Sequence, residues 1–467
     1  MKTAACIVLA VVCLTPLVKG QRVPPAAIYI AHVSVVDVIA GNVQPDMTVE
    51  IDGRTIASVK PTRDVRIRGD ARVIDGRGRY LIPALWDMHV HLSWPAGAAK
   101  IFLPVLVANG VLGVRDMHSI LPVIDSIRRD VVSGRQIGPR LFIAGPAIDG
   151  PNSYLPVARI VNTPEEARRA VQELKAGGVN FIKVYSSLPR DLYYAVASEA
   201  KSEGIPFAGH VPYALTAAEA SDARQRSLEH LTEVDVGTSS DEAKIKAEEL
   251  EAVAQKHGYL PDATRLRATF DSAKAASLFD RFRRNETWQC PTLIVLHALR
   301  DHAQRGHVAS DSLIVYIPKM LRKLWESMPA DLNARIGALG EFHSTLIAPI
   351  NRAGVPMLAG SDLANAYVYP GFGLHDELGL LVRAGLTPAE ALRTATINPA
   401  RFLGLTDSLG VVAPGKVADL VLLDGNPLQN IANTRKIRAV IQGGRLFDRR
   451  ALDGLLRSAK ELAAISK

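Results

Sequence analysis

The chain has 467 residues, a formal net charge of +8 and 48% hydrophobic residues, a composition typical of globular proteins. This length exceeds one ordinary core and favours a large α/β domain with a smaller appended one. The positive charge is modest for this length, and no cluster of Lys and Arg is interleaved with aromatic residues, which argues against nucleic-acid binding.

The amino terminus has the pattern of an export signal. Lys2 precedes an apolar stretch over residues 3–18, and the small residue Gly20 ends the segment. We expect residues 1–20 to be a cleaved signal peptide and the mature protein to be periplasmic or secreted, without stable membrane insertion. A single-pass anchor is the alternative, although the apolar run is short for a bilayer span. Cleavage would leave Cys290 as the only cysteine and exclude an internal disulfide.

Both ends of the remaining chain predict β structure. Residues 21–82 contain short runs rich in Val and Ile, separated by turn signals such as Asp52-Gly53. The same pattern returns over residues 408–467, which end in a predicted helix. We expect the two ends to pair into one small β-sandwich that flanks the larger domain.

Residues 83–407 alternate apolar strands with amphipathic helices. One unit predicts a helix over 164–175, capped by Thr163 and ended by Gly177-Gly178, and then a strand over 181–185. About eight such units predict an α/β fold of the TIM-like (β/α)8 barrel type. Residues 239–285 are helical, charged and rich in alanine, and they interrupt this alternation. We expect them to form a lid or rim, with a solvated helical pair as the alternative.

His89 and His91 stand at the end of the apolar run 80–86, which predicts a buried strand of a parallel sheet. Side chains two residues apart on a strand share a face. Four further polar residues follow later apolar runs: Lys183, His210, His230 and Asp362. Because the carboxyl ends of barrel strands converge on one cavity, we expect these six side chains to meet there. Nitrogen and oxygen donors suit zinc, manganese, cobalt or iron.

This set of residues resembles that of the amidohydrolase superfamily. The superfamily has His-x-His on strand one, a lysine on strand four, histidines on strands five and six, and an aspartate on strand eight. Residues 415–424 and 394–400 are similar to its returning β segment and to its helix after the last barrel strand. The resemblance extends over residues 28–448. One departure is Ala84, where many relatives have glycine.

The resemblance implies a centre with two divalent metal ions, expected to be zinc. Lys183 would be carboxylated by carbon dioxide, and its carbamate would bridge the ions. One ion would be held by His89, His91 and Asp362, and the other by His210 and His230. A hydroxide shared by the ions would be the nucleophile, because metal binding lowers the pKa of water, and Asp362 would pass its proton to the leaving group. A single metal beside an unmodified lysine, as in deaminase-like members, is the alternative.

The resemblance is nearest to prolidases and N-acyl amino acid amidohydrolases. We therefore expect hydrolysis of a small amide, dipeptide or N-acyl amino acid. Dipeptidase members tend to carry Gly-Gly soon after the lysine, whereas Val184 and Tyr185 follow it here. Hydrolysis of a lactone, ester or phosphotriester at the same metals is one alternative, and a metal-stabilised protein without activity is another. The expected partner is a small-molecule substrate. The sequence does not decide between a monomer and a homo-oligomer.

Several side chains near strand ends are candidates for the substrate pocket. Tyr213 follows His210 by three residues, and we expect its hydroxyl to donate to the substrate carbonyl, with a packed rim tyrosine as the alternative. Arg115 could bind a substrate carboxylate, with a structural ion pair as the alternative. The further candidates are Asn152, Tyr154, Tyr185, His297 and His375. For His297 and His375 the alternative is a supporting role or a place on the surface.

Overall fold

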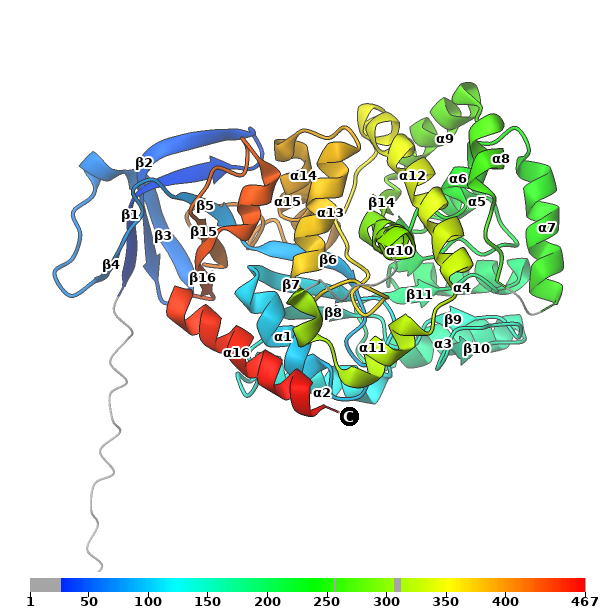
Figure 1. Cartoon of the computed structure of the whole chain (residues 1–467), viewed down its shortest axis with the longest axis horizontal. Coiled ribbons are helices and arrows are strands. Elements are labelled where there is room, and N and C mark those ends of the chain that lie inside the picture. Colours follow the sequence, from blue (N-terminus) through cyan, green and yellow to red (C-terminus); the bar gives the residue numbers. More distant parts are fainter. Residues whose placement is uncertain (1–26, 256–257, 306–311, 467) are drawn as a thin grey trace, which may run out of the picture.

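The computed structural model describes residues 27–255, 258–305 and 312–466. It has a β-rich part at one end and a larger part of mixed helices and strands at the other (Figure 1). The predicted signal peptide, residues 1–20, lies outside the described residues. No helix within the described ranges is long and apolar enough to cross a membrane.

The two chain ends pair into one eight-stranded sheet with the order β17-β16-β15-β5-β1-β2-β3, in which β4 also pairs with β1. Its strands are β1 (Ile28–Asp37), β2 (Asn42–Asp52), β3 (Thr55–Pro61), β4 (Arg72–Asp75), β5 (Tyr80–Pro83), β15 (Leu420–Leu423), β16 (Ile437–Gln442) and β17 (Arg445–Asp448). The ends meet where β15 runs antiparallel to β5. The predicted pairing of the ends is confirmed. In place of the two sheets expected for a sandwich, the described strands form one continuous sheet.

The remaining strands form two parallel sheets, β6-β7-β8 and β10-β9-β11-β12-β13-β14. They are β6 (Leu85–Val90), β7 (Val111–Asp116), β8 (Arg140–Ile143), β9 (Ile148–Asp149), β10 (Arg159–Ile160), β11 (Ile182–Val184), β12 (Phe207–Gly209), β13 (Ser227–Glu229) and β14 (Trp288–Cys290). Isolated parallel bridges join Gln289 to Met357 and Val90 to Leu363. Parallel strands joined through helices confirm the α/β class.

The apolar run 80–86 is not one strand of the parallel sheet, and that prediction is wrong. The chain changes sheets at Ala84. β5 belongs to the terminal sheet, where it pairs with β1 and β15, whereas β6 pairs with β7. The Ala84 amide donates to Asp419 O, and the next amide, Leu85 N, donates to Gly110 O. The sequence pattern shows only that the segment is apolar on both faces. Since the segment is buried in both sheets, this pattern could not reveal the change of sheet.

Helices follow most of the parallel strands. They are α1 (Ala99–Ala108), α2 (Leu121–Val132), α3 (Pro164–Ala176), α4 (Arg190–Ser202), α5 (Ala217–Asp222), α6 (Val234–Gly237), α10 (Leu293–Arg305), α11 (Lys319–Glu326), α12 (Ala330–Arg352), α13 (Phe372–Arg383), α14 (Pro388–Thr394), α15 (Ile397–Phe402) and α16 (Arg449–Ile465). The predicted cap of α3 is present, because Thr163 accepts a hydrogen bond from the Glu166 amide and Gly177 ends the helix. Short 3₁₀ turns are η1 (Thr62–Asp64), η2 (Ser312–Tyr316) and η3 (Ile431–Arg435).

Residues 239–285 form three helices, α7 (Glu242–Ala254), α8 (Ala263–Ala268) and α9 (Ser272–Asn285). Each of α8 and α9 starts at an aspartate, Asp262 or Asp271, that accepts hydrogen bonds from its first turn. The α9 helix packs against α5 in the outer layer, and α8 packs against α12. In Figure 1 these helices stand at the end of the molecule opposite the terminal sheet.

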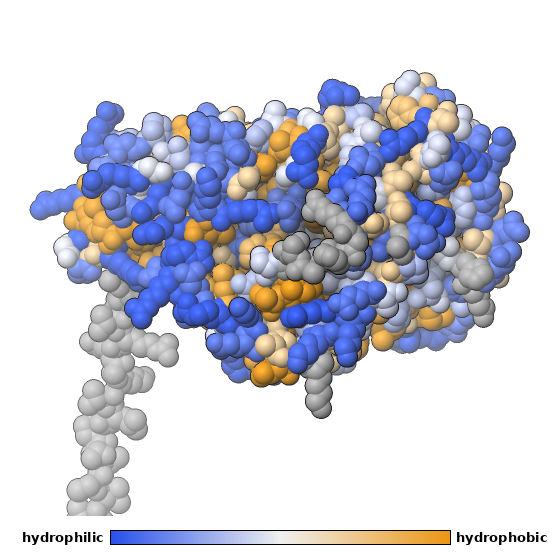
Figure 2. Space-filling model, viewed as in Figure 1, coloured by the Kyte–Doolittle hydropathy of each residue, from blue (hydrophilic) through white to orange (hydrophobic). Residues whose placement is uncertain are grey.

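The core is one large apolar cluster under the helices, with a separate cluster under the terminal sheet. The C-terminal helix α16 packs on α1 through buried residues such as Leu452 and Ala459. Figure 2 shows hydrophilic residues over most of this face, with apolar residues in smaller groups between them. The packed helices therefore enclose the parallel strands and leave their carboxyl ends free to build a site.

Candidate metal centre

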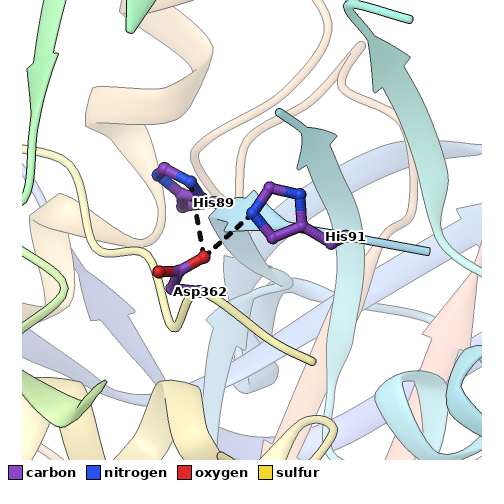
Figure 3. Close-up of side chains that lie close together, drawn as sticks. All are labelled: His89, His91 and Asp362. Atoms are coloured by element: carbon purple, nitrogen blue, oxygen red, sulfur yellow. Dashed lines mark ion pairs between the residues drawn. The ribbon is translucent and has the colours of Figure 1, made fainter. Parts of the chain in front are cut away.

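His89, His91 and Asp362 converge on one point. His89 lies in β6 and His91 directly follows it. His91 Nε2 lies 3.0 Å from Asp362 Oδ1, and His89 Nε2 lies 3.5 Å from the same oxygen. Figure 3 shows both imidazoles turned toward this carboxylate. Their ligand atoms lie close enough together to hold one metal ion.

His210 and His230 extend this group on its other side. The ring centres of these two histidines lie 4.7 Å apart, and the His230 ring lies 4.6 Å from that of His89. Asp362 Oδ2 lies 3.8 Å from His230 Nδ1. Lys183, the central residue of β11, lines the same cavity and is 1% exposed. The structure therefore brings together all six side chains that the sequence nominated.

Protein groups hold Nδ1 of each of the four histidines. The partners are Glu229 Oε2 for His89 at 2.9 Å, His118 O for His91 at 3.2 Å, Ser186 Oγ for His210 at 2.8 Å and Thr292 Oγ1 for His230 at 2.6 Å. Such contacts fix the orientation of ligand rings in metalloproteins. They leave Nε2 of each ring available to a metal ion.

Local backbone geometry creates room for these side chains. A Cβ atom on Gly360 would lie 2.8 Å from Cβ of His89, so only glycine lets the segment before Asp362 approach β6. Gly209 has φ +135°, and a Cβ there would lie 2.8 Å from Cδ of Lys183. His230 and Asp362 have φ of 65° and 57°, a strained conformation that is common at functional sites.

The protonation states favoured by this environment suit a metal ion. Burial lowers the pKa of His89, His210 and His230 below the ordinary histidine value. The neighbouring histidines lower the pKa of Asp362 despite its burial. Metal ligands must be neutral imidazoles and ionised carboxylates. His91 differs, because the Asp362 carboxylate raises its pKa against the effect of burial, and a metal ion would have to displace its proton.

Two further observations show that the residues fit a divalent cation. Asp362 Oδ1 is buried and accepts no well-aligned hydrogen bond from any described residue, which leaves a carboxylate lone pair for a ligand. Lys183 Nζ has no hydrogen bond or ion pair with any described residue, and burial lowers its pKa to about 8. An unpaired buried ammonium is costly, so this lysine is suited to modification.

The six side chains line a cavity of about 730 Å³. Tyr154, Tyr185 and Tyr213 line it close by, and the Tyr185 ring lies 4.2 Å from that of His210. The Tyr213 hydroxyl has only long contacts, 3.4 Å to the Tyr154 hydroxyl, 3.3 Å to Tyr259 O and 3.4 Å to Tyr259 N. These three tyrosines therefore line the same cavity as the six side chains.

Arg115 does not reach the cavity, and its proposed contact with a substrate carboxylate is wrong. Its side chain is fully buried behind the site. Nε donates to Met88 O at 2.6 Å, Nη1 donates to Ser227 Oγ at 2.8 Å, and Nη2 donates to both carboxylate oxygens of Glu229 at 2.9 Å. The guanidinium therefore supports β6 and β13, which is the structural alternative.

Three other pocket candidates are also misplaced. His297 lies in α10 and pairs with Ser344 Oγ. His375 lies in α13 between Thr434 Oγ1 and Asn109 O, where it joins this helix to η3. Neither histidine lines the cavity, and Asn152 does not line it either. Proximity to a strand end was too weak a signal, because helices after the strands also begin there.

Glu229 is the functional residue that sequence reasoning missed. It lies in β13 next to His230 and is fully buried. Its carboxylate accepts hydrogen bonds from Arg115 and Ser227 and contacts Nδ1 of His89. A carboxylate inside a short apolar strand was the available signal, because such a group needs a partner. The partner itself could not be read from the sequence.

Comparisons with known proteins agree with this site. A model of the Amidohydrolase family matches residues 80–447. Adenine deaminase 2 of Agrobacterium fabrum (strain C58) is 25% identical over 432 residues, which cover 89% of this chain and 56% of the relative. Imidazolonepropionase of Anaeromyxobacter sp. (strain K) is 28% identical over 435 residues, 86% of this chain and 90% of the relative. The chain thus spans little more than half the length of the adenine deaminase.

A crystal structure of a Xaa-Pro dipeptidase with methionine bound in its active site superimposes with a TM-score of 0.69 and 21% identity. The alignment covers 91% of this chain and 100% of the dipeptidase chain. At this identity the similarity establishes the fold alone. Because the family model covers most of the sequence, the chain belongs to the amidohydrolase family.

Proposed function

We propose that this protein is an exported metal-dependent hydrolase that cleaves the C–N bond of a small amide, dipeptide or N-acyl amino acid. The observation that carries the proposal is the convergence of the six side chains, His89 and Asp362 among them, in one cavity. Membership of the amidohydrolase family supports it. A deaminase and a dipeptidase among the similar proteins also act on C–N bonds.

The proposal includes two divalent metal ions, most simply zinc, at a closed (β/α)8 barrel. His89, His91 and Asp362 would hold one ion, and His210 and His230 the other, with Lys183 between them. When bound, such ions activate water and polarise a carbonyl group. The bridges from β14 to Met357 and from Leu363 to β6 support closure, because residues 357–363 would then be the strand between β14 and β6.

The protein's own groups handle the proton and the substrate. Asp362 would accept a proton from the attacking water and deliver it to the leaving nitrogen, because its Oδ1 accepts no well-aligned hydrogen bond and lies beside His89 and His91. Tyr213 would donate a hydrogen bond to the substrate carbonyl from its hydroxyl, which has only long contacts in the protein. Tyr154 and Tyr185 would confine the substrate beside it.

A chelator is expected to abolish the amide hydrolysis, and added zinc or manganese to restore it, because the ligand residues cannot activate water alone. The measurement is turnover of a panel of N-acyl amino acids, dipeptides, lactones and an aminopurine, before and after dialysis against dipicolinate. Turnover of lactones alone would replace the amide assignment with the ester alternative. Release of ammonia from the aminopurine would support a deaminase instead.

Lys183 is expected to carry a carbamate. A lysine ammonium has no lone pair for a metal, whereas a carbamate supplies two oxygens. We expect metal-free protein to regain several-fold more activity when zinc is added with bicarbonate than without it. Labelled bicarbonate should give a carbamate carbon signal by ¹³C NMR in the parent protein. Lys183→Arg, which keeps the charge, should give no signal, and an equal signal in both proteins would contradict the assignment.

A further inference from the structure

A second polar cluster lies in the wall of the same cavity and includes no side chain of the candidate metal centre. It consists of Glu233 and Asp235, which begin α6, Glu249 of α7 and His343 of α12. All four line the cavity, and each is at most 3% exposed. Buried ionisable groups away from the metal ligands call for a separate explanation.

The cluster has more negative than positive charge. Lys246 Nζ lies 2.6 Å from Glu233 Oε2 and 2.8 Å from Glu249 Oε2. Asp235 Oδ2 lies 2.9 Å from His343 Nε2. Three carboxylates thus share one ammonium, that of Lys246. Burial raises the pKa of Glu233 and of Glu249.

His343 shows that the cluster lacks a donor. In the neutral imidazole whose Nε2–H donates to the Asp235 carboxylate, Nδ1 keeps a lone pair. Nδ1 is buried and has no hydrogen-bond partner among the described residues. A buried acceptor without a donor is costly. A ligand that brings N–H groups to this part of the cavity would remove that cost.

The rest of the cavity fits an apolar arm rather than an anion. Apart from the two groups of polar side chains, its wall includes Val295, Leu296, Leu299 and Leu339. No arginine of the described residues lines the cavity, and Lys183 is its only lysine. Since Arg115 is engaged with Glu229, the described wall offers no guanidinium to a substrate carboxylate.

We propose that Glu233, Glu249, Asp235 and His343 form a subsite for an ammonium or guanidinium group on an apolar arm of the substrate. The inference rests on the proposed function, because the amide at the other end of that arm is placed at the metal centre. The substrate class is then an amide of a basic amino acid or of a diamine. Lys246 holds the two glutamates in position.

The test uses substrates that differ only in charge. Arginine and citrulline have side chains of nearly equal shape, and the second is neutral. For N-acyl derivatives and dipeptides of the two, we expect kcat/KM to be at least about tenfold higher for the arginine compounds, since hydrogen bonds to charged groups are the strong ones. Equal values, or a preference for citrulline, would overturn the subsite.

Two variants test whether the polar cluster causes the preference for arginine compounds. Glu233→Gln and Glu249→Gln keep the side-chain volume and remove one charge each, and both should bring the arginine-to-citrulline ratio close to one. Glu251→Gln is the matched control, because Glu251 lies exposed on α7, the helix that also carries Glu249. This variant should keep the parent ratio. Circular dichroism and thermal melting check that each variant is folded. A parent ratio retained in both cluster variants would contradict the proposal.

A binding experiment separates this inference from the proposed activity. Agmatine carries a guanidinium on an alkyl arm and contains no amide. Calorimetry should show that it binds the zinc-loaded parent protein at least about tenfold more tightly than Glu249→Gln. Binding without turnover of any amide would support the subsite and reject the hydrolase. Turnover of neutral amides without agmatine binding would support the hydrolase and reject the subsite.

Discussion

Replacement of Asp362 by asparagine is expected to lower amide turnover by roughly 10²–10⁴-fold, the usual contribution of a positioned acid or base. Asparagine keeps the shape and one oxygen, but it cannot take the proton of the attacking water. The carboxylate also lies 3.0 Å from His91 and 3.5 Å from His89, so the loss of its charge should weaken metal binding as well. Turnover under saturating zinc and metal content by mass spectrometry measure the two effects.

The control for this variant is Asp407→Asn, in which the replaced carboxylate is exposed. It should retain the parent turnover and metal content. A metal-loaded Asp362→Asn protein with the parent rate would contradict the proton-transfer role. If the variant were slow but regained the parent rate at higher zinc concentration, Asp362 would act only as a metal ligand.

Replacement of Arg115 by methionine is expected to cost about 3–5 kcal/mol of folding free energy, because it leaves the buried Glu229 carboxylate without its cation. Both residues of the pair have no solvent exposure. Removing the charge also frees Glu229, which orients His89 through Nδ1. Denaturant unfolding of the metal-free variant and parent measures the loss of stability without the contribution of bound metal.

Arg129→Met is the comparison, since Arg129 pairs with Asp125 on the surface of α2. Exposed pairs contribute about 0–1 kcal/mol. If Arg115→Met were no more destabilising than Arg129→Met, the buried pair would not support the strands below the site. The double variant Arg115→Met/Glu229→Gln should recover part of the loss, because no uncompensated carboxylate then remains.

Some errors in the sequence prediction have a common origin in contacts between distant residues. The sequence predicts one strand over residues 80–86, whereas in the structure Ala84 separates β5 of the terminal sheet from β6. The two segments are equally apolar, and partners such as Asp419 decide which sheet each one joins. Local sequence could not decide whether Arg115 binds the substrate or forms a structural pair, because its acceptors, Ser227 and Glu229, are more than a hundred positions away.

The sequence by itself determined the class of fold, the pairing of the chain ends and the six side chains that meet at the metal centre. Each of these follows from a local pattern: apolar strands with period two, helices with caps, and polar residues where strands stop. The pairing of Arg115 with Glu229 and of Asp235 with His343 was decided by the tertiary structure. Strand order and helix packing bring these residues together, and no local pattern encodes which distant element becomes the neighbour.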